Sequence, residues 1–209
     1  MSGKFITLEG GEGAGKSTLA RALAARLGRA GVDAVVTREP GGSPGADAIR
    51  ALFVRGAADK FAPLTDALLI AAARSDHVAR TIAPALAAGR WVICDRFTDS
   101  TRAYQGAGRG VDVRTLAALD ALIDAPVPHL TLVLDLDPKS GVRRSQGAQA
   151  GEDRFEKMDL AFHERVRAAF LSIAADEPQR CAVIDAAKDK DAVLAAALAA
   201  IAARLGVQA

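Results

Sequence analysis

Short apolar runs alternate along the chain with longer stretches in which apolar residues recur at helical spacing. Five of these runs are rich in aliphatic and β-branched residues and have the length of buried strands, namely residues 4–9, 33–37, 90–97, 130–136 and 181–185. The stretches between them have the periodicity of amphipathic helices. This alternation of strand and helix predicts a single α/β domain over residues 1–209.

Proline, glycine and short polar residues mark the ends of the predicted helices. The helices are expected over residues 18–31, 46–55, 63–83, 111–124, 138–144, 154–175 and 192–203. Pro84 lacks the amide hydrogen that a helix interior needs, so we expect it to kink or end the third helix. The last helix is rich in alanine, carries its large side chains on one face and is too short to cross a bilayer. It is therefore predicted to face the core.

Two stretches have no apolar periodicity. Residues 98–110 contain short polar residues, glycines and Tyr104, the only tyrosine of the chain, and are predicted to form a loop or a loose helix. Such segments at strand ends often carry binding residues. The second stretch, residues 145–152, predicts a mobile lid at about residues 143–154 that closes over bound substrate.

Charge and cysteine content exclude several classes of function. The formal net charge is +2, and Lys and Arg are scattered singly, which does not favour a nucleic acid polymer or a membrane as partner. Cys94 and Cys181 both fall in predicted buried strands, where a free thiol behaves as a small apolar side chain. We therefore expect a reducing, cytoplasmic setting.

Residues 10–17 (GGEGAGKS) fit the phosphate-binding pattern G-x-x-x-x-G-K-[ST] and stand between a predicted strand and a predicted helix. Glycines let successive backbone amides turn toward an anion, and the helix N-terminus adds partial positive charge. In such a loop the lysine lies along the β- and γ-phosphates, and the serine hydroxyl holds Mg²⁺. The residues predicted to bind ATP are Gly10, Gly11, Glu12, Gly13, Ala14, Gly15, Lys16, Ser17 and Thr18.

Charged residues also stand at the ends of two other predicted strands. Asp95 ends the third strand in the pattern of a carboxylate that supports Mg²⁺, so the predicted metal ligands are Ser17 and Asp95. Arg38 ends the second strand, and ligands of open α/β sheets bind at the carboxyl ends of strands. We interpret Arg38 as an anion contact. The Arg, Asp and His within residues 74–77 either face solvent or line a pocket.

A phosphate-binding loop occurs in switches, motors and enzymes, so further features must separate these classes. The chain contains no Asn and therefore lacks the Asn-Lys-x-Asp segment with which GTP-dependent switches read guanine. It also lacks the larger domain or repeated modules expected of an ATPase machine. Separate arginines at strand ends favour a small kinase with a phosphorylated second substrate. A deoxynucleoside kinase and another monophosphate kinase stay open as alternatives.

Five segments occur in an order that points to one family. They are residues 8–18 (LEGGEGAGKST), 37–42 (TREPGG), 72–74 (AAR), 95–97 (DRF) and 103–106 (AYQG). Together they resemble bacterial thymidylate kinase. The resemblance implies Mg²⁺-dependent transfer of the γ-phosphate of ATP to dTMP, giving dTDP and ADP. It also implies a five-stranded parallel sheet flanked by helices on both faces, of the P-loop NTPase type, and a homodimer.

The resemblance further implies roles for individual residues. Arg38 would grip the dTMP phosphate, Arg96 would lie between the two phosphoryl centres, and Arg74 would donate to a thymine carbonyl. The residues implied in dTMP binding are Glu12, Arg38, Ile70, Arg74, Arg96, Ser100, Thr101, Tyr104 and Gln105. Those implied in catalysis are Lys16, Glu12, Arg96 and Arg144.

Two positions depart from the family pattern. Many relatives carry a Phe stacked on thymine where this chain has Ile70, and many carry several lid arginines where this chain has Gln and Ala within residues 146–149. Of the arginines that remain, we assign Arg144 to the transferring phosphate. Arg143 and Arg154 are alternatives, and a solvated pair of arginines at the helix end is another.

Overall fold

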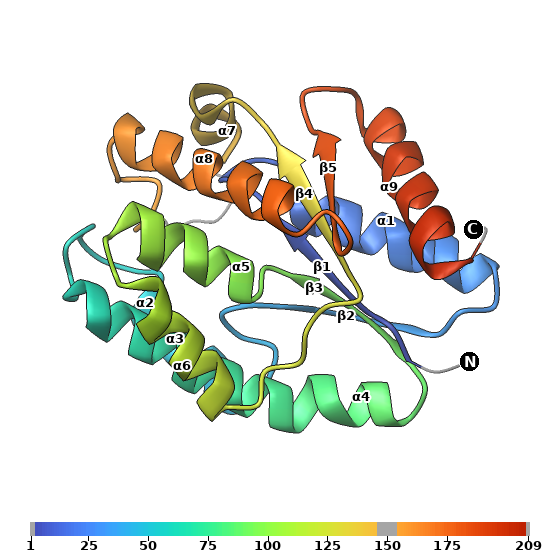
Figure 1. The fold of residues 1–209 in the computed structure, drawn as a ribbon, viewed down its shortest axis with the longest axis horizontal. Helices are drawn as coiled ribbons and strands as arrows, with labels where there is room; N and C mark the ends of the chain where they lie inside the picture. Colours follow the sequence, from blue (N-terminus) through green and yellow to red (C-terminus); the bar gives the residue numbers. More distant parts are fainter. Residues whose placement is uncertain (1–2, 146–153, 208–209) are drawn as a thin grey trace.

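Five parallel strands form the centre of the computed structural model, which describes residues 3–145 and 154–207. The strands are β1 (Phe5–Glu9), β2 (Ala34–Arg38), β3 (Trp91–Asp95), β4 (Leu130–Asp135) and β5 (Cys181–Asp185). Their order across the sheet is β2-β3-β1-β4-β5 (Figure 1). The α/β class and the five-stranded parallel sheet expected from the sequence are confirmed.

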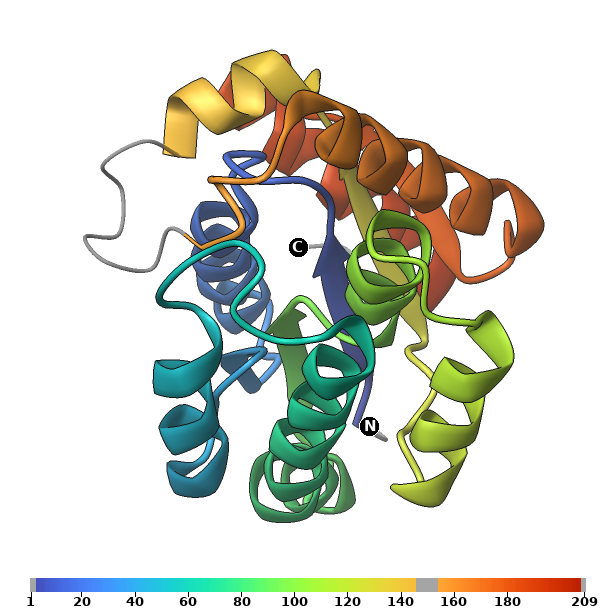
Figure 2. The same ribbon diagram turned by 90° about the vertical axis from the view of Figure 1, so that its left-hand side faces the viewer.

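Helices cover both faces of this sheet (Figures 1 and 2). They are α1 (Lys16–Arg29), α2 (Pro44–Phe53), α3 (Pro63–His77), α4 (Ala83–Ala87), α5 (Thr98–Thr101), α6 (Val113–Leu122), α7 (Pro138–Ser145), α8 (Leu160–Asp176) and α9 (Lys190–Leu205). Side chains of β1 alternate between the two faces. Ile6 and Leu8 pack with residues of α1 and α9, whereas Phe5 packs with Ala85 of α4. This alternation explains why the strands are apolar along their whole length.

The register of the sheet brings the carboxyl ends of three strands together. Leu8 of β1 pairs with Asp95 of β3, and Asp95 pairs with Arg38 of β2. Ligands of open parallel sheets bind outside this edge. The sheet therefore gathers Glu9, Arg38 and Asp95, which lie far apart in the sequence, at the edge where α1 begins.

The third helical stretch continues past Pro84, where we expected a kink or an end. After α3 the chain continues as a π-helical segment, η1 (Val78–Ile82), and then as α4. Pro84 lies in the first turn of α4. The wider π-helical turn that precedes Pro84 accommodates a residue without an amide hydrogen, so the helix continues past it.

The helix predicted over residues 154–175 begins later, at Leu160. Asp159 caps it, because its side chain accepts a hydrogen bond of 2.7 Å from the backbone N–H of Phe162. Residues 154–157 form a turn instead. The predicted lid at about residues 143–154 falls mainly on 146–153, which lie outside the described residues.

Residues 98–110, predicted as a loop or loose helix, are largely helical. They form α5 followed by a second π-helical segment, η2 (Arg102–Gly108). Cys94 and Cys181 are buried free thiols, as expected. Within the described ranges, no helix has the length and apolar character needed to span a bilayer.

Candidate active site

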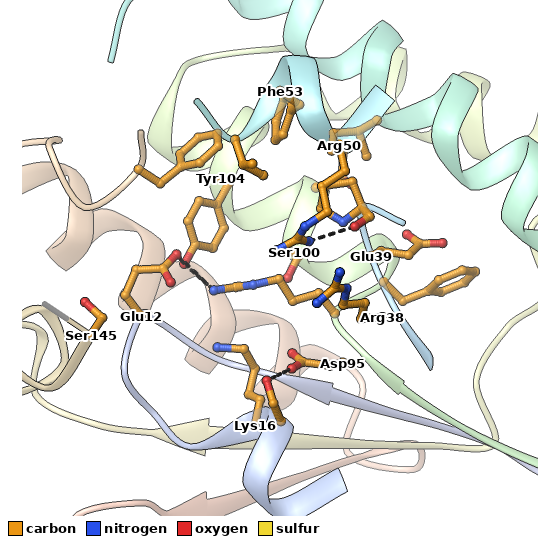
Figure 3. A pocket seen from close by; sticks show the side chains of 18 of the residues that line it. Glu12, Lys16, Arg38, Glu39, Arg50, Phe53, Asp95, Ser100, Tyr104 and Ser145 are labelled. Atoms are coloured by element: carbon orange, nitrogen blue, oxygen red, sulfur yellow. Dashed lines mark hydrogen bonds and ion pairs between the residues drawn. The ribbon is translucent and has the colours of Figure 1, made fainter. Parts of the chain in front are cut away.

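A cavity of about 380 Å³ opens at the carboxyl edge of β1, β2 and β3. Figure 3 shows Lys16 and Asp95 at one end of it and Phe53 and Tyr104 at the other. All predicted dTMP-binding residues line this cavity, together with part of the phosphate-binding loop, Glu39, Arg50, Phe53, Val54 and Arg144. The predicted contacts are thus brought into one place.

The phosphate-binding loop leaves the start of α1 open to an anion. Gly15 is the N-cap of α1, has a φ of 91° that favours glycine, and offers no side-chain hydrogen bond to the first turn. Gly13 must also be glycine, because a Cβ there would lie 2.0 Å from the carbonyl oxygen of Gly141. The amides of the first turn can therefore bind phosphate oxygens.

The Lys16 side chain lies against the phosphate-binding loop. Its Nζ donates to the carbonyl oxygens of Gly10 at 3.1 Å and Gly11 at 2.7 Å, and the side chain is buried. Burial and the neighbouring charge of Arg96 lower the pKa of Lys16 to about 8, against the opposing effect of Asp95 and Glu12. Within the part of the chain that the structure describes, its ammonium group has no direct carboxylate partner and is available for a phosphate.

Ser17 and Asp95 face each other at the same end of the cavity. The Ser17 hydroxyl donates a hydrogen bond to Oδ2 of Asp95, and the Ser17 side chain is exposed. Within the described ranges, no group of three or more His, Cys, Asp and Glu side chains is arranged to hold a metal ion. A hydroxyl and a carboxylate suit Mg²⁺, which takes oxygen ligands and completes its shell with water and phosphate.

Arg96 connects the loop to the middle of the cavity. Its Nη1 donates to the Gly10 carbonyl at 3.0 Å, and its Nη2 donates to Glu12 and to the Tyr104 hydroxyl, each at 3.0 Å. Arg96 has a backbone φ of 70°, which is uncommon for a residue other than glycine. Residues with such strained backbone angles are often found at functional sites. The guanidinium is thus held at the centre of the site.

Glu12 stays charged in this position. The Tyr104 hydroxyl donates to its Oε1 at 2.8 Å. Burial opposes the charged form, but Arg96, Lys16 and the Tyr104 hydroxyl together lower the pKa of Glu12 to about 2. A carboxylate therefore faces the cavity beside the loop, between Arg96 and Tyr104.

Glu9 lies beneath Arg96 and does not reach the cavity. It accepts hydrogen bonds from the backbone N–H of Phe97 at 2.8 Å and from the hydroxyl of Ser100 at 2.5 Å. Burial and the nearby Asp99 raise the pKa of Glu9 to about 7. Its contacts fix the start of α5, which carries Ser100 and leads into η2, which carries Tyr104.

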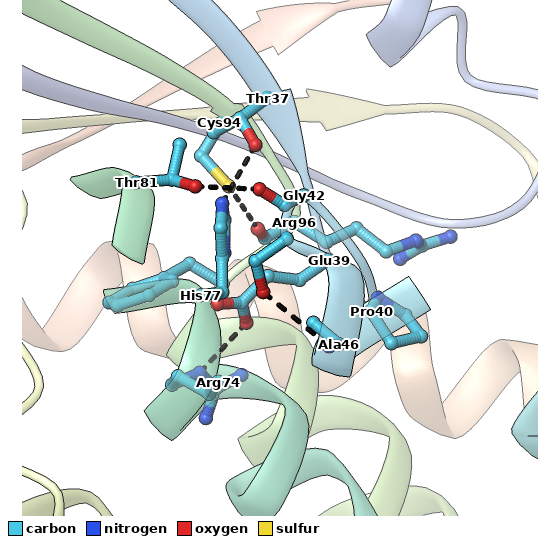
Figure 4. Close-up of polar contacts among 12 residues, drawn as sticks. Thr37, Glu39, Pro40, Gly42, Ala46, Arg74, His77, Thr81, Cys94 and Arg96 are labelled. Atoms are coloured by element: carbon cyan, nitrogen blue, oxygen red, sulfur yellow. Dashed lines mark hydrogen bonds and ion pairs between the residues drawn. The ribbon is translucent and has the colours of Figure 1, made fainter. Parts of the chain in front are cut away.

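The Arg74 guanidinium is held by three neighbouring side chains, of which Figure 4 shows Glu39. It donates to Glu39 at 2.8 Å, to Asp120 at 3.0 Å and to the Thr101 hydroxyl at 2.9 Å. Glu39 also contacts His77 Nδ1 at 3.0 Å. Arg74 and His77 are both buried, but only Arg74 lines the cavity, so the pocket alternative holds for Arg74 and not for His77. Because Arg has five N–H donors, Arg74 keeps donors for a ligand.

Arg154 lies away from the phosphate end. Its guanidinium is fully buried and makes a two-pronged contact with Asp66, at 2.9 and 3.0 Å, and Arg109 contacts the same carboxylate. Among the alternatives for the catalytic arginine, Arg144 lines the cavity beside Gly13, whereas Arg143 and Arg154 do not line it.

Arg50, Phe53 and Glu39 are cavity residues that the sequence did not indicate. Arg50 donates to the Pro40 carbonyl at 2.7 Å, and Phe53 packs beside Ile70. Both lie on the face of α2 that helical periodicity assigns to the interior. The only sign of this in the sequence is that the charged Arg50 occupies a position of α2 where the helical pattern predicts an apolar residue.

Comparison with known proteins identifies the family. A profile of the family described as thymidylate kinase matches residues 8–197. A thymidylate kinase of Caulobacter vibrioides is 56% identical over 206 residues, which is 98% of this chain and 99% of that protein. A thymidylate kinase of Rhizorhabdus wittichii is 52% identical over 97% of this chain and 98% of its own length.

A solved structure agrees with these sequence matches. The crystal structure of thymidylate kinase from Ehrlichia chaffeensis superimposes with a TM-score of 0.79 at 33% identity, covering 97% of this chain and 99% of that one. The fold, the phosphate-binding loop and the near full-length similarity lead to one conclusion. The chain belongs to the thymidylate kinase family, which uses ATP to phosphorylate dTMP to dTDP.

Proposed function

We propose that the chain works as a single kinase domain that holds ATP on residues 10–18 and dTMP in the cavity. The main support for this orientation is that charged and apolar side chains line different ends of the cavity. Lys16 and Arg96 donate to carbonyl groups of the phosphate-binding loop, whereas Phe53, Val54 and Ile70 form an apolar cluster at the far end. A nucleoside monophosphate has the same division between phosphate and base.

The dTMP phosphate is proposed to lie between Arg38, Arg50 and Arg96. All three side chains line the cavity, and Arg96 is held there by Glu12 at 3.0 Å. Arginine suits this role because its planar donors match phosphate oxygens.

Catalysis is proposed to rest on charge stabilisation at the transferring group. Lys16 would exchange its bonds to the Gly10 and Gly11 carbonyls for phosphate oxygens, and Arg144 would add positive charge from α7. Ser17 and Asp95 would hold Mg²⁺, which neutralises charge on the β- and γ-phosphates when bound.

The sugar and base are proposed to lie between α3 and η2. Arg74 and Gln105 line this part of the cavity, with Thr101 and Ser100 at its edge. The Tyr104 ring stands beside the Arg96 guanidinium, with the guanidinium carbon 4.7 Å from its centroid. A ring in this position leaves little room for a 2′-hydroxyl, which favours a deoxynucleotide.

We also propose a homodimer formed through α2 and α3, in a cytoplasmic setting. These helices lie side by side in both ribbon views (Figures 1 and 2) and expose Leu52, Leu64 and Leu68. Leu64 and Leu68 are one helical turn apart and share a face of α3. An exposed apolar strip of this kind favours a protein interface. The free thiols of Cys94 and Cys181 support a reducing compartment.

The test is ADP release with a panel of phosphate acceptors, namely dTMP, dUMP, UMP, AMP and thymidine. We expect the highest kcat/KM with dTMP. Equal use of UMP, or transfer to thymidine in preference to dTMP, would overturn the proposed orientation and favour another monophosphate kinase or a nucleoside kinase. Replacement of Tyr104 by Ala should raise kcat/KM for UMP relative to dTMP if the ring excludes the 2′-hydroxyl.

A further inference from the structure

The apolar end of the cavity is built from residues of α2 and α3. Phe53, Val54 and Ile70 form one buried cluster against which Phe155 packs. Ile70 stands one turn before Arg74 on α3 and presents an aliphatic side chain to the cavity. Phe53, the last residue of α2, presents an aromatic ring beside it. The ring at this end of the cavity thus comes from a different helix than the one that carries Arg74.

We propose that Phe53 provides the aromatic wall against which the thymine base packs, and that it sets the affinity for dTMP. The proposal rests on the proposed orientation of dTMP, with the base at the end away from the phosphate-binding loop. An aromatic ring makes its most favourable packing contacts with flat, apolar groups. The faces of a thymine base are flat and largely apolar.

The Phe53 ring packs against the side chains of Arg154 and Phe155. The guanidinium carbon of Arg154 lies 5.3 Å from its centroid, and Nη1 of Arg154 donates to the Phe53 carbonyl at 3.2 Å. The Phe155 ring lies 5.2 Å away at an angle of 38°. Because Arg154 is itself fixed by the buried Asp66, the ring does not have to be ordered when the ligand binds.

The other aromatic rings near the cavity have different contacts. The Phe97 ring is fully buried between Phe5 and the Arg74 guanidinium, whose carbon lies 4.9 Å from its centroid. The Tyr104 hydroxyl is bound to Glu12 and Arg96 at the sugar end. Phe155 packs against the cluster from outside and also meets Tyr104 edge to face, at 86°. Phe53 is therefore the buried aromatic ring that shares this cluster with Ile70 at the base end.

The first test compares Phe53→Leu with Phe61→Leu. Phe61 is a matched control because its ring also lies 5.3 Å from the Arg154 guanidinium carbon but does not line the cavity. We expect Phe53→Leu to raise KM for dTMP about tenfold, as for other losses of apolar contact, and to leave kcat within about twofold. KM for ATP should stay unchanged in both variants. An unchanged KM for dTMP, or an equal rise in Phe61→Leu, would overturn the proposal.

The second test asks whether a ring on α3 can replace the one on α2. Adding Ile70→Phe to Phe53→Leu should lower KM for dTMP back toward the unmutated value. A double variant with no recovery would show that the loss comes from something other than a missing ring.

A third measurement uses the unmutated protein and does not depend on how the variants fold. 5,6-Dihydro-dTMP keeps the carbonyl groups and the phosphate but has a non-planar, saturated base. We expect its KM to be about tenfold above that of dTMP because the flat contact with Phe53 is lost. Equal KM values would overturn the role of the ring while leaving dTMP phosphorylation itself intact. Failure to use dTMP at all would instead contradict the proposed function.

Discussion

Lys16 combines burial with a role that requires positive charge. Its pKa is lowered to about 8 in the free protein, so the ammonium form is lost as pH rises through that value. We predict that kcat/KM for Mg·ATP falls about tenfold per pH unit above pH 8, because this parameter reports the free enzyme. The kcat profile should stay flat there, since bound phosphates stabilise the charged lysine. Initial rates from pH 6 to 9.5 provide the measurement.

Two variants serve as controls for this assignment. Lys16→Ala should lower kcat about 100- to 1000-fold, as expected for removal of a preorganised charge, and should abolish the alkaline decline. Glu12→Gln should move the decline to lower pH, because Glu12 favours the charged form of Lys16. A decline at the same pH in Lys16→Ala would assign it to another group.

Glu9 should make stability depend on pH. Its pKa is raised from an ordinary 4.5 to about 7, so the folded protein holds a proton that the unfolded chain has lost. The stabilisation is complete below pH 4.5 and is lost as pH rises through 7, by on the order of 1 kcal/mol per pH unit. Relative to Glu9→Gln, the free energy of unfolding of the unmutated protein should decline between pH 5 and 8. Urea unfolding at both values measures the difference, and parallel behaviour of the two proteins would contradict the prediction.

Among the elements, α3 is tied to the turn before α8 by a buried ion pair. Asp66 and Arg154 are both fully buried, so removal of one partner leaves an unpaired charge. We predict that Asp66→Ala lowers the free energy of unfolding by about 3–5 kcal/mol. Urea unfolding provides the measurement. Asp59→Ala is the matched control, because Asp59 is an exposed carboxylate in the preceding connection and its removal should cost little. Equal losses in the two variants would argue against the buried pair.

At the end of α7 we predict that a substitution affects catalysis and leaves stability nearly unchanged. Arg144 lies beside Gly13 of the phosphate-binding loop and lines the cavity, and its Nη1 donates to the Ala186 carbonyl at 3.1 Å. Arg144→Ala should lower kcat about 100-fold or more while leaving KM for dTMP and the melting temperature nearly unchanged. Steady-state kinetics and thermal unfolding measure both quantities. Arg143→Ala, which removes an exposed neighbour outside the cavity, should leave kcat unaltered. Normal kcat in Arg144→Ala would remove this residue from catalysis.

At the scale of the whole molecule, the exposed leucines of α3 bear on assembly. Leu64 and Leu68 are each 49% exposed, and so is Val183 at the edge of the sheet on β5. We predict that Leu64→Glu together with Leu68→Glu produces a monomer, because paired charges at the interface would lose their water. Val183→Glu, with the same exposure, should leave the dimer intact. Light scattering during gel filtration measures the mass. A monomeric unmutated protein would contradict the proposed dimer.

The sequence by itself determined the features that depend on neighbouring residues. The phosphate-binding loop follows from the local order of strand, glycines, lysine and helix, and Asp95 follows from its place at the end of an apolar strand. The five strands and the α/β class follow from periodicity, because burial on both faces of a parallel sheet requires continuous apolar runs. The structure confirmed the five parallel strands and the α/β class, with helix boundaries that differ at Pro84 and Leu160.

The tertiary structure alone decided which distant residues meet. Periodicity marks a helix face as buried but does not show whether a core, a cavity or a charged partner covers it. For that reason Arg50 and Phe53 of α2 became cavity residues, and Arg154 became the partner of Asp66, 88 positions away along the chain. Glu39 likewise acquired its role only when α3 brought Arg74 and His77 against it. Such contacts arise from the packing of helices on the sheet, and sequence patterns within one element contain no information about the element that packs on it.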